Sequence, residues 1–387
     1  MQLTYMRQLL AQKQQQSLYR AEAVTEPLPG GRLRATVDGI TRQYLNFSGN
    51  DYLGLSADSQ LRQIYADAAL CYGAASTGSP LVTGYHPVHQ ALTDELCEWL
   101  GVDDVLLLSS GFAANQAMLQ ALVGEQDLLL LDKLCHASMI DAAMHKPHFQ
   151  RFLHNDLQSL SQRLSKAQQP CVIATEGVFS MDGDSPDLAM LVKTAGETPV
   201  LLDDAHGIGV QGAEGAGSWA AQGLKAQHFQ CLMANFGKAL AAQGGFLAGS
   251  SDVIDFIRQQ ARHYIYSTAL SPALSVLIRA TVQRVRTEQW RRDKLQENIA
   301  TFRALASDSH LPLLASHSAI QPVMMASSEV ALAVSQRLKE QGIWVSAIRP
   351  PTVPTARLRV TLSAAHQVED LQVLIGTLQQ ALQEANV

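Results

Sequence analysis

The sequence predicts an α/β protein, with a large domain built on a mostly parallel sheet and a smaller α+β domain at its C-terminal end. Between residues 88 and 249, short aliphatic runs alternate with helical stretches, which is the order of elements in α/β proteins. The runs lack polar alternation, so helices should bury both faces of their strands, as in parallel sheets. After residue 250 the sequence is mainly helical, with a few short strands near its end.

Each predicted element follows from one of these patterns. Strands of the large domain are expected at residues 105–108, 127–131, 171–175, 200–202, 231–234 and 245–248. A long helix over 272–305 should link the domains, and the small domain should hold strands at 320–323, 344–346 and 358–362 with helices at 329–340 and 368–383. A helix over 4–18 and a turn at 27–31 should pack beside it. The predicted division is therefore an N-terminal segment 1–45, a large domain 46–270, and a linking helix with the small domain 271–387.

Composition excludes several classes of protein. A length of 387 residues suits two or three domains, and a net charge of −6 without charge blocks argues against nucleic-acid binding. No apolar run approaches the roughly 18–20 residues that cross a bilayer, and the N-terminus lacks a secretory signal, so no membrane contact and a cytoplasmic location are expected. The five cysteines are scattered and should be free thiols.

Polar residues follow several predicted strands at the point where each strand ends. Asp203 and His206 follow the strand at 200–202, and Lys238 follows the next strand. Ser110 and Gly111 follow the first strand, where a helix begins. Since ligands of open parallel sheets bind at the carboxyl ends of the strands, these residues should meet at one site.

Each of these features has an ordinary explanation by itself. A lone Lys238 suits a solvated charge, and Ser110 suits a plain helix cap. Together, one chemistry explains them: a lysine Schiff base to pyridoxal phosphate, an acidic partner for the pyridine nitrogen, and backbone amides for the phosphate. A nucleotide-binding α/β protein without a Schiff base remains the alternative from the residues alone.

No metal site is expected. The pairs His86 and His89, and His145 and His148, have a spacing that helices use for metals, but no carboxylate or thiol set completes either site.

Several segments together resemble the α-oxoamine synthases, which are fold-type I pyridoxal phosphate enzymes that condense an amino acid with an acyl thioester. These segments are residues 46–55, 175–184, 203–207, 236–238 and 266–268. Within the family, residues 347–354 and 357–359 resemble the biotin-pathway member, which joins L-alanine to pimeloyl thioester on acyl carrier protein or CoA. Enzymes of the 2-amino-3-oxobutyrate ligase and 5-aminolevulinate synthase type remain alternatives, differing in acyl group and amino acid.

The resemblance assigns roles to residues that would hold the cofactor. It implies that Lys238 forms the Schiff base, Asp203 pairs with the pyridinium nitrogen and acts as a catalytic residue, and His136 stacks on the ring. His206 would contact the phenolic oxygen. The phosphate would be met by Gly111, Phe112, Ser180 and Asn235, the last of which replaces the threonine usual in similar sequences.

The resemblance also assigns the substrates. Asn50 and Arg359, with His136 nearby, match positions that bind the amino-acid carboxylate. Arg20 and Thr352, with Arg349 close in sequence, match positions that meet the acyl chain. Ser267 and Thr268 resemble a segment that reaches the phosphate of a neighbouring subunit, so a homodimer with shared sites is expected.

Overall fold

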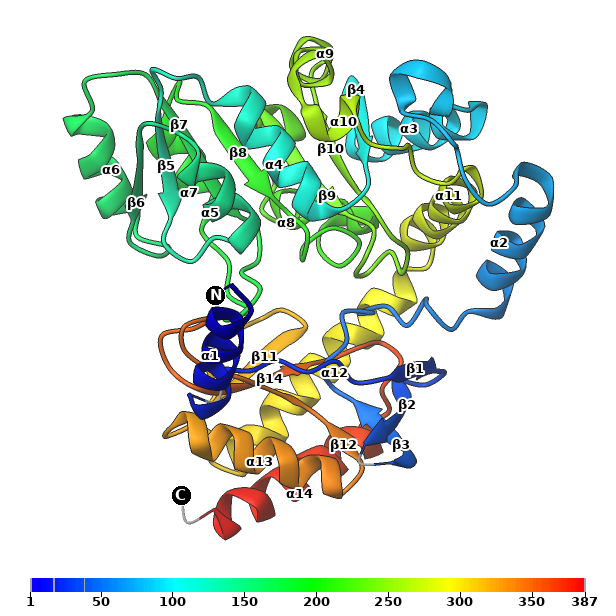
Figure 1. The fold of residues 1–387 in the computed structure, drawn as a ribbon, viewed down its shortest axis with the longest axis vertical. Coiled ribbons are helices and arrows are strands. Elements are labelled where there is room, and N and C mark those ends of the chain that lie inside the picture. Colours follow the sequence, from blue (N-terminus) through cyan, green and yellow to red (C-terminus); the bar gives the residue numbers. More distant parts are fainter. Residues whose placement is uncertain (1, 17, 38, 386–387) are drawn as a thin grey trace.

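The computed structural model describes residues 2–16, 18–37 and 39–385. Figure 1 shows a large part above a small part, with helix α12 (Gln289–Asp308) running from one into the other. The large part is built on a seven-stranded sheet, and the small part holds sheets of four and three strands. Within the described residues, no helix has the length and apolar character needed to span a membrane.

The large sheet has the strand order β4-β10-β9-β8-β7-β5-β6. The pairings from β9 to β6 are parallel, and β10 is antiparallel to both of its neighbours. The prediction of a mostly parallel sheet is therefore confirmed. The strands are β4 (Asp104–Leu108), β5 (Leu128–Asp132), β6 (Phe149–Phe152), β7 (Cys171–Glu176), β8 (Val200–Asp203), β9 (Cys231–Asn235) and β10 (Gly245–Gly249).

Both faces of this sheet are buried, as the absence of polar alternation predicts. Along β5, Leu129 and Leu131 pack into one apolar cluster, whereas Leu128 and Leu130 pack into another. Helices α4 (Gly111–Leu122), α5 (Ala137–Met144), α9 (Ser251–Gln260) and α10 (Arg262–Ile265) contribute to the first cluster. The second cluster takes residues from α2 (Ser59–Tyr72), α3 (Pro87–Leu100), α6 (Leu157–Lys166), α7 (Leu188–Ala195), α8 (Ser218–Ala221) and α11 (Pro272–Thr287).

The small part joins segments from both ends of the chain. One sheet pairs β1 (Thr25–Leu28), β2 (Arg32–Val37), β3 (Ile40–Asn46) and β12 (Ile343–Trp344), with β12 parallel to β3. The other has the order β11-β14-β13, formed by β11 (Ile320–Met324), β14 (Arg357–Thr361) and β13 (Ser346–Ile348). Helices α1 (Gln2–Gln15), α13 (Ser328–Glu340) and α14 (Val368–Glu384) complete the chain's regular structure, together with three single-turn helices: η1 (Pro80–Gly84), η2 (Ala213–Gly215) and η3 (Ala226–His228).

The predicted helix over 272–305 is wrong as a single element. It is divided into α11 and α12 at Glu288, whose backbone angles of φ −91° and ψ 66° are not helical. The break has a packing cause, because α11 lies against α2 and α3 in the large part, whereas α12 lies against α14 in the small part. The predicted helix over 4–18 corresponds to α1, and Ser17 of that range lies outside the described residues.

One loop of the large part bears directly on the small part. This segment, residues 177–184, follows β7, and we name it the Ser180 loop. The hydroxyl of Ser316 donates to the carbonyl of Gly183 at 2.8 Å, and Arg357 pairs with Asp182. Gly183 has φ +70°, and a Cβ there would lie 2.3 Å from the carbonyl oxygen of Ile320. Only glycine therefore fits this contact.

Substitution of Gly183 should distinguish the cost of a steric clash from the cost of a left-handed backbone conformation. Gly183→Ala is expected to lower the free energy of unfolding by about 3 kcal/mol or more, because it adds a backbone clash to a left-handed conformation. Gly101→Ala is the matched control, since Gly101 has φ +65° but no neighbour within 4 Å of its added Cβ. The control should lose only about 1 kcal/mol. If urea unfolding gives equal losses of unfolding free energy for the two variants, this account of how the Ser180 loop packs against the small part is contradicted.

Candidate active site

Two ionisable groups of opposite charge lie at the ends of neighbouring strands. Asp203 ends β8 and is 4% exposed, and Lys238 follows β9 by three residues. Asn115 Nδ2 donates to Asp203 Oδ2 at 2.7 Å, and the backbone N–H of Ala205 donates to Oδ1 at 2.9 Å. These two donors fix the orientation of the Asp203 carboxylate.

The Lys238 ammonium is partly desolvated at this strand end. Burial lowers the pKa of Lys238 to about 8, although the nearby carboxylates of Asp203 and Glu176 act in the opposite direction. Near neutral pH, a substantial fraction of this amine is therefore unprotonated and able to act as a nucleophile or base.

The neighbouring Asp204 has a different environment. Its Oδ2 accepts the backbone N–H of Ser218 at 2.8 Å, and a Cβ at Gly177 or Gly207 would lie within 2.3 Å of its Oδ1. Burial raises the pKa of Asp204 to about 7. Asp204 is therefore packed against Gly177 and Gly207, whereas Asp203 is the carboxylate that Asn115 holds.

The two histidines differ in exposure. His136 caps the N-terminus of α5, and its exposed ring is held by a hydrogen bond of 2.8 Å between Nδ1 and Ser138 Oγ. His206 is buried, and its Nδ1 lies 2.8 Å from the hydroxyl of Tyr52. Burial lowers the pKa of His206 well below its usual range, so this ring is neutral at physiological pH.

A helix N-terminus lies beside these groups. Ser110 caps α4 by accepting the backbone N–H of Ala113 at 3.1 Å, so the plain helix-cap interpretation of this serine is confirmed. The first N–H groups of a helix have no partner within the helix and attract anions. A Cβ at Gly111 would lie 3.1 Å from the side chain of Asn235, a tight contact, so glycine allows Asn235 to approach this helix start closely.

The small part contributes Arg359 from β14. Its Nε donates to the carbonyl of Ser180 at 2.6 Å, while its Nη2 lies 3.4 Å from Asn50 Oδ1. The Tyr52 hydroxyl donates to the same oxygen of Asn50 at 3.1 Å. The two residues expected to bind a carboxylate are thus in contact with each other, and Arg359 also contacts the Ser180 loop.

The other expected residues lie at the surface. Arg20 Nη2 donates to Thr352 Oγ1 at 3.4 Å, although these residues are 332 positions apart in the chain. Thr268 is exposed and Ser267 half-buried in the segment after α10, and Phe112 is 45% exposed beside Gly111.

Sequence reasoning missed three buried residues of this region. Asn115 lies one turn after Gly111 in α4, Glu176 ends β7, and Tyr52 lies two residues after Asn50. The backbone N–H of His136 donates to the Glu176 carboxyl, and burial raises the pKa of Glu176 well above its usual range. Helical spacing from Gly111 could have identified Asn115, because residues four apart share a helix face.

Comparison with known proteins agrees with this arrangement. The family model described as aminotransferase class I and II matches residues 42–378. The chain belongs to the aminotransferase class I and II family. Relatives in this family include the 8-amino-7-oxononanoate synthase of Vibrio vulnificus (strain YJ016), which is 44% identical over 376 residues and covers 96% of each chain. The enzyme of the same name from Cronobacter sakazakii is 45% identical, covering 93% of this chain and 94% of its own.

Solved structures share this fold. A variant of serine palmitoyltransferase from S. paucimobilis with a bound PLP–myriocin aldimine has a TM-score of 0.92 and 25% identity, covering 99% of both chains. The 8-amino-7-oxononanoate synthase from Francisella tularensis has a TM-score of 0.78 and 27% identity, covering 88% of this chain and 98% of its own. The fold-type I prediction and the resemblance stated from the sequence are confirmed.

The lowered pKa of Lys238 can be measured by trace acetylation with acetic anhydride. Hydroxylamine first releases any aldehyde bound to a lysine, and labelled peptides are quantified by mass spectrometry between pH 6.5 and 10.5. Only the neutral amine reacts, so labelling of Lys238 should reach half its maximum near pH 8. An ordinary lysine reaches it near pH 10.4. Asp203→Asn should lower the Lys238 midpoint, because it removes an anion that favours the ammonium; a midpoint near 10 for Lys238 would contradict the assignment.

Proposed function

We propose that this protein condenses L-alanine with a pimeloyl thioester, carried by acyl carrier protein or CoA, to give 8-amino-7-oxononanoate in biotin biosynthesis. The reaction also releases carbon dioxide and the free thiol. One observation carries the proposal: Lys238 and Asp203 occupy adjacent strand ends beside Arg359, in a chain 44% identical to relatives of that name over nearly its full length. A cytoplasmic location belongs to the same proposal.

The residues of the site fit pyridoxal phosphate. Lys238 offers a partly neutral amine for the cofactor aldehyde, and Asp203 offers a buried carboxylate for the pyridine nitrogen. The phosphate would be bound at the start of α4, by the backbone N–H groups of Gly111 and Phe112 and by the side chains of Ser180 and Asn235. When bound, pyridoxal phosphate supplies an electron sink that stabilises negative charge at the substrate Cα.

The protein controls the protons of this reaction. Asp203, oriented by the Asn115 amide, would hold a proton on the pyridine nitrogen. Lys238 Nζ removes the Cα proton of alanine as a general base and later returns a proton to the same carbon. The exposed His136 ring would stack on the cofactor, and His206, fixed through Tyr52, would bond its phenolic oxygen.

Arg359 and Asn50 would bind the alanine carboxylate. The Nε of Arg359 is already bonded to the Ser180 carbonyl, which fixes the guanidinium plane. Its Nη1 and Nη2 lie 3.5 and 3.4 Å from Asn50 Oδ1, so the alanine carboxylate would meet both residues together. The same carboxylate leaves as carbon dioxide after the Cα has bonded to the thioester carbonyl carbon and the C–S bond has broken. Arg20, Thr352 and Arg349 would bind the acyl chain.

A product assay tests this function directly. Purified protein is offered L-alanine or glycine with pimeloyl-carrier, pimeloyl-CoA, acetyl-CoA and succinyl-CoA thioesters, and products are identified by mass. We expect 8-amino-7-oxononanoate from alanine with pimeloyl donors, full activity in Lys193→Ala, and none in Lys238→Ala. Products from glycine with acetyl-CoA or succinyl-CoA would favour the other α-oxoamine synthases. No condensation product and no visible absorbance would favour the nucleotide-binding alternative.

The contact between Arg20 and Thr352 predicts a selective effect on the acyl substrate. Arg20→Ala should raise the KM for the pimeloyl thioester about tenfold, a loss of about 1.4 kcal/mol in binding, and leave the alanine affinity nearly unchanged. Alanine is titrated by absorbance and the thioester by steady-state rate. Lys13→Ala removes another exposed cation near the N-terminus and serves as the control. Unchanged thioester kinetics would remove Arg20 from the acyl site.

We also propose a homodimer in which Ser267 and Thr268 complete the partner subunit's phosphate site. The exposed position of Thr268, next to a Tyr266 side chain that is 70% exposed, supports a role between subunits. Mixing inactive Lys238→Ala and Thr268→Ala chains should restore partial activity, because one of the two sites in a mixed dimer is then intact. No recovery after subunit exchange would contradict shared sites.

A further inference from the structure

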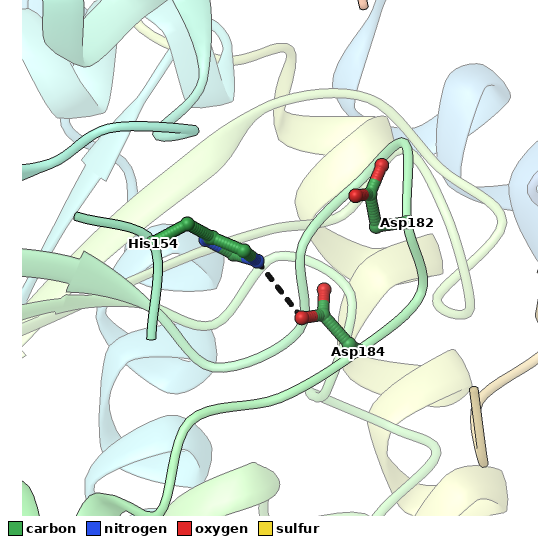
Figure 2. A group of neighbouring side chains, drawn as sticks. All are labelled: His154, Asp182 and Asp184. Carbon is green, nitrogen blue, oxygen red and sulfur yellow. Dashed lines mark hydrogen bonds and ion pairs between the residues drawn. The ribbon is translucent and has the colours of Figure 1, made fainter. Parts of the chain in front are cut away.

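A histidine outside the proposed active site lies between two carboxylates. His154 follows β6, and its Nδ1 is 2.9 Å from Asp132 Oδ1 at the end of β5. Its Nε2 is 2.8 Å from Asp184 Oδ2 at the end of the Ser180 loop, the contact drawn as a dashed line in Figure 2. The ring therefore links the strand ends β5 and β6 to that loop.

The surrounding hydrogen bonds determine how many protons the ring carries. Asp132 is fully buried and also accepts the backbone N–H groups of Leu134 at 2.8 Å and Asn155 at 2.9 Å. Asp184 Oδ2 also accepts from Asn155 Nδ2 at 2.7 Å. Both carboxylates therefore act as acceptors, whereas a neutral imidazole has a single N–H to donate. An imidazolium, with two N–H groups, satisfies both contacts.

The electrostatic balance agrees with this assignment. Burial lowers the pKa of His154, but the hydrogen bonds to Asp132 and Asp184 outweigh it and raise this pKa to about 10. Asp182, which lies close to this pair, is itself paired with Arg357, whose side chain is 3% exposed. His154 and Arg357 thus offset two of the three carboxylate charges.

The group His154, Asp182 and Asp184 in Figure 2 has the composition of a metal site but not its chemistry. A metal requires a free lone pair on imidazole, and both nitrogens of His154 face carboxylates. Asp182 is bonded to Arg357. The positive charge that a cation would provide is supplied by His154.

The Ser180 loop is consequently held from two sides. On one side the edge of the Phe179 ring meets His154, with ring centres 4.4 Å apart, and the backbone N–H of Phe179 donates to the Asp184 carbonyl at 2.9 Å. On the other side Arg359 Nε bonds the Ser180 carbonyl. Ser180 lies between these two anchors.

We propose that His154 is a positioning residue: as an imidazolium bridging Asp132 and Asp184, it fixes the Ser180 loop and thereby the hydroxyl of Ser180 for an anionic phosphate. The charged bridge itself does not depend on the proposed function, whereas the phosphate part rests on the proposed pyridoxal phosphate site. His154 touches neither substrate nor cofactor in this assignment.

The charge is tested first by NMR of protein labelled with ¹⁵N-histidine. We expect both ring nitrogens of His154 to carry protons from pH 6 to 8.5, with the resonances assigned by their loss in His154→Gln. One unprotonated nitrogen in this range would overturn the imidazolium. The measurement needs no substrate, so it stands even if the proposed condensation fails.

The positioning is tested by hydrogen exchange of the Phe179 and Gly183 amides in the holoenzyme. His154→Gln should make both exchange at least tenfold faster, while amides in α14 stay unchanged. His148→Gln, the same substitution at an exposed histidine before β6, is the matched control. Unchanged exchange in the loop, or equally faster exchange throughout the chain, would overturn positioning. If His154→Gln does not fold, Asp184→Ala removes the acceptor at the less buried end and should give the same pattern.

The phosphate role has its own readout. After removal of bound cofactor, His154→Gln should bind pyridoxal phosphate at least tenfold more weakly than the unaltered protein. Its affinity for pyridoxal, which lacks the phosphate, should change less than twofold. Equal weakening for both compounds would show a general structural defect and overturn the phosphate role.

Discussion

The opposed charges of Asp203 and Lys238 are the interaction on which the other parts of the site depend. Both groups are desolvated at the ends of β8 and β9, where an unpaired charge would be costly. Parallel pairing brings these strand ends together, and buried leucines on both sheet faces keep them in register. Asn115 then orients the carboxylate from α4. The sheet therefore provides a fixed electrostatic field, and the surrounding loops determine which molecule enters it.

The Ser180 loop connects this field to the small part of the molecule. Arg359 and Arg357 both come from β14, yet both bond to residues of this loop. The anchor for a substrate carboxylate and the candidate phosphate contact thus share one short segment. Movement of the small part would displace both contacts together. The geometry of the carboxylate subsite and that of the phosphate subsite are therefore coupled through the Ser180 loop.

Much of this arrangement could be predicted from the sequence, because strand exits in a parallel sheet converge. That rule brought Asp203, His206 and Lys238 together, and aliphatic runs located six of the seven strands. The edge strand β6 escaped notice because Gln150 and Arg151 face solvent and break its apolar pattern. The bend at Glu288 and the contact of Arg20 with Thr352 depend on tertiary packing between distant segments, which local patterns do not encode. Asn115 lies one helical turn after Gly111, and that spacing alone marks it, because the strand-exit rule does not extend into α4.

The parallel pairing of β3 with β12 has a consequence for how the chain is made. Strand β3 ends at Asn46, and its partner begins at Ile343, so the edge of β3 lacks this partner until about 300 further residues have been added. At about 5–20 residues per second, ribosomal synthesis leaves that edge open for roughly 15–60 s. The central α/β part can close its own sheet during this interval, since its strands lie between residues 104 and 249. Strand β3 is therefore synthesised early but completes its pairing late.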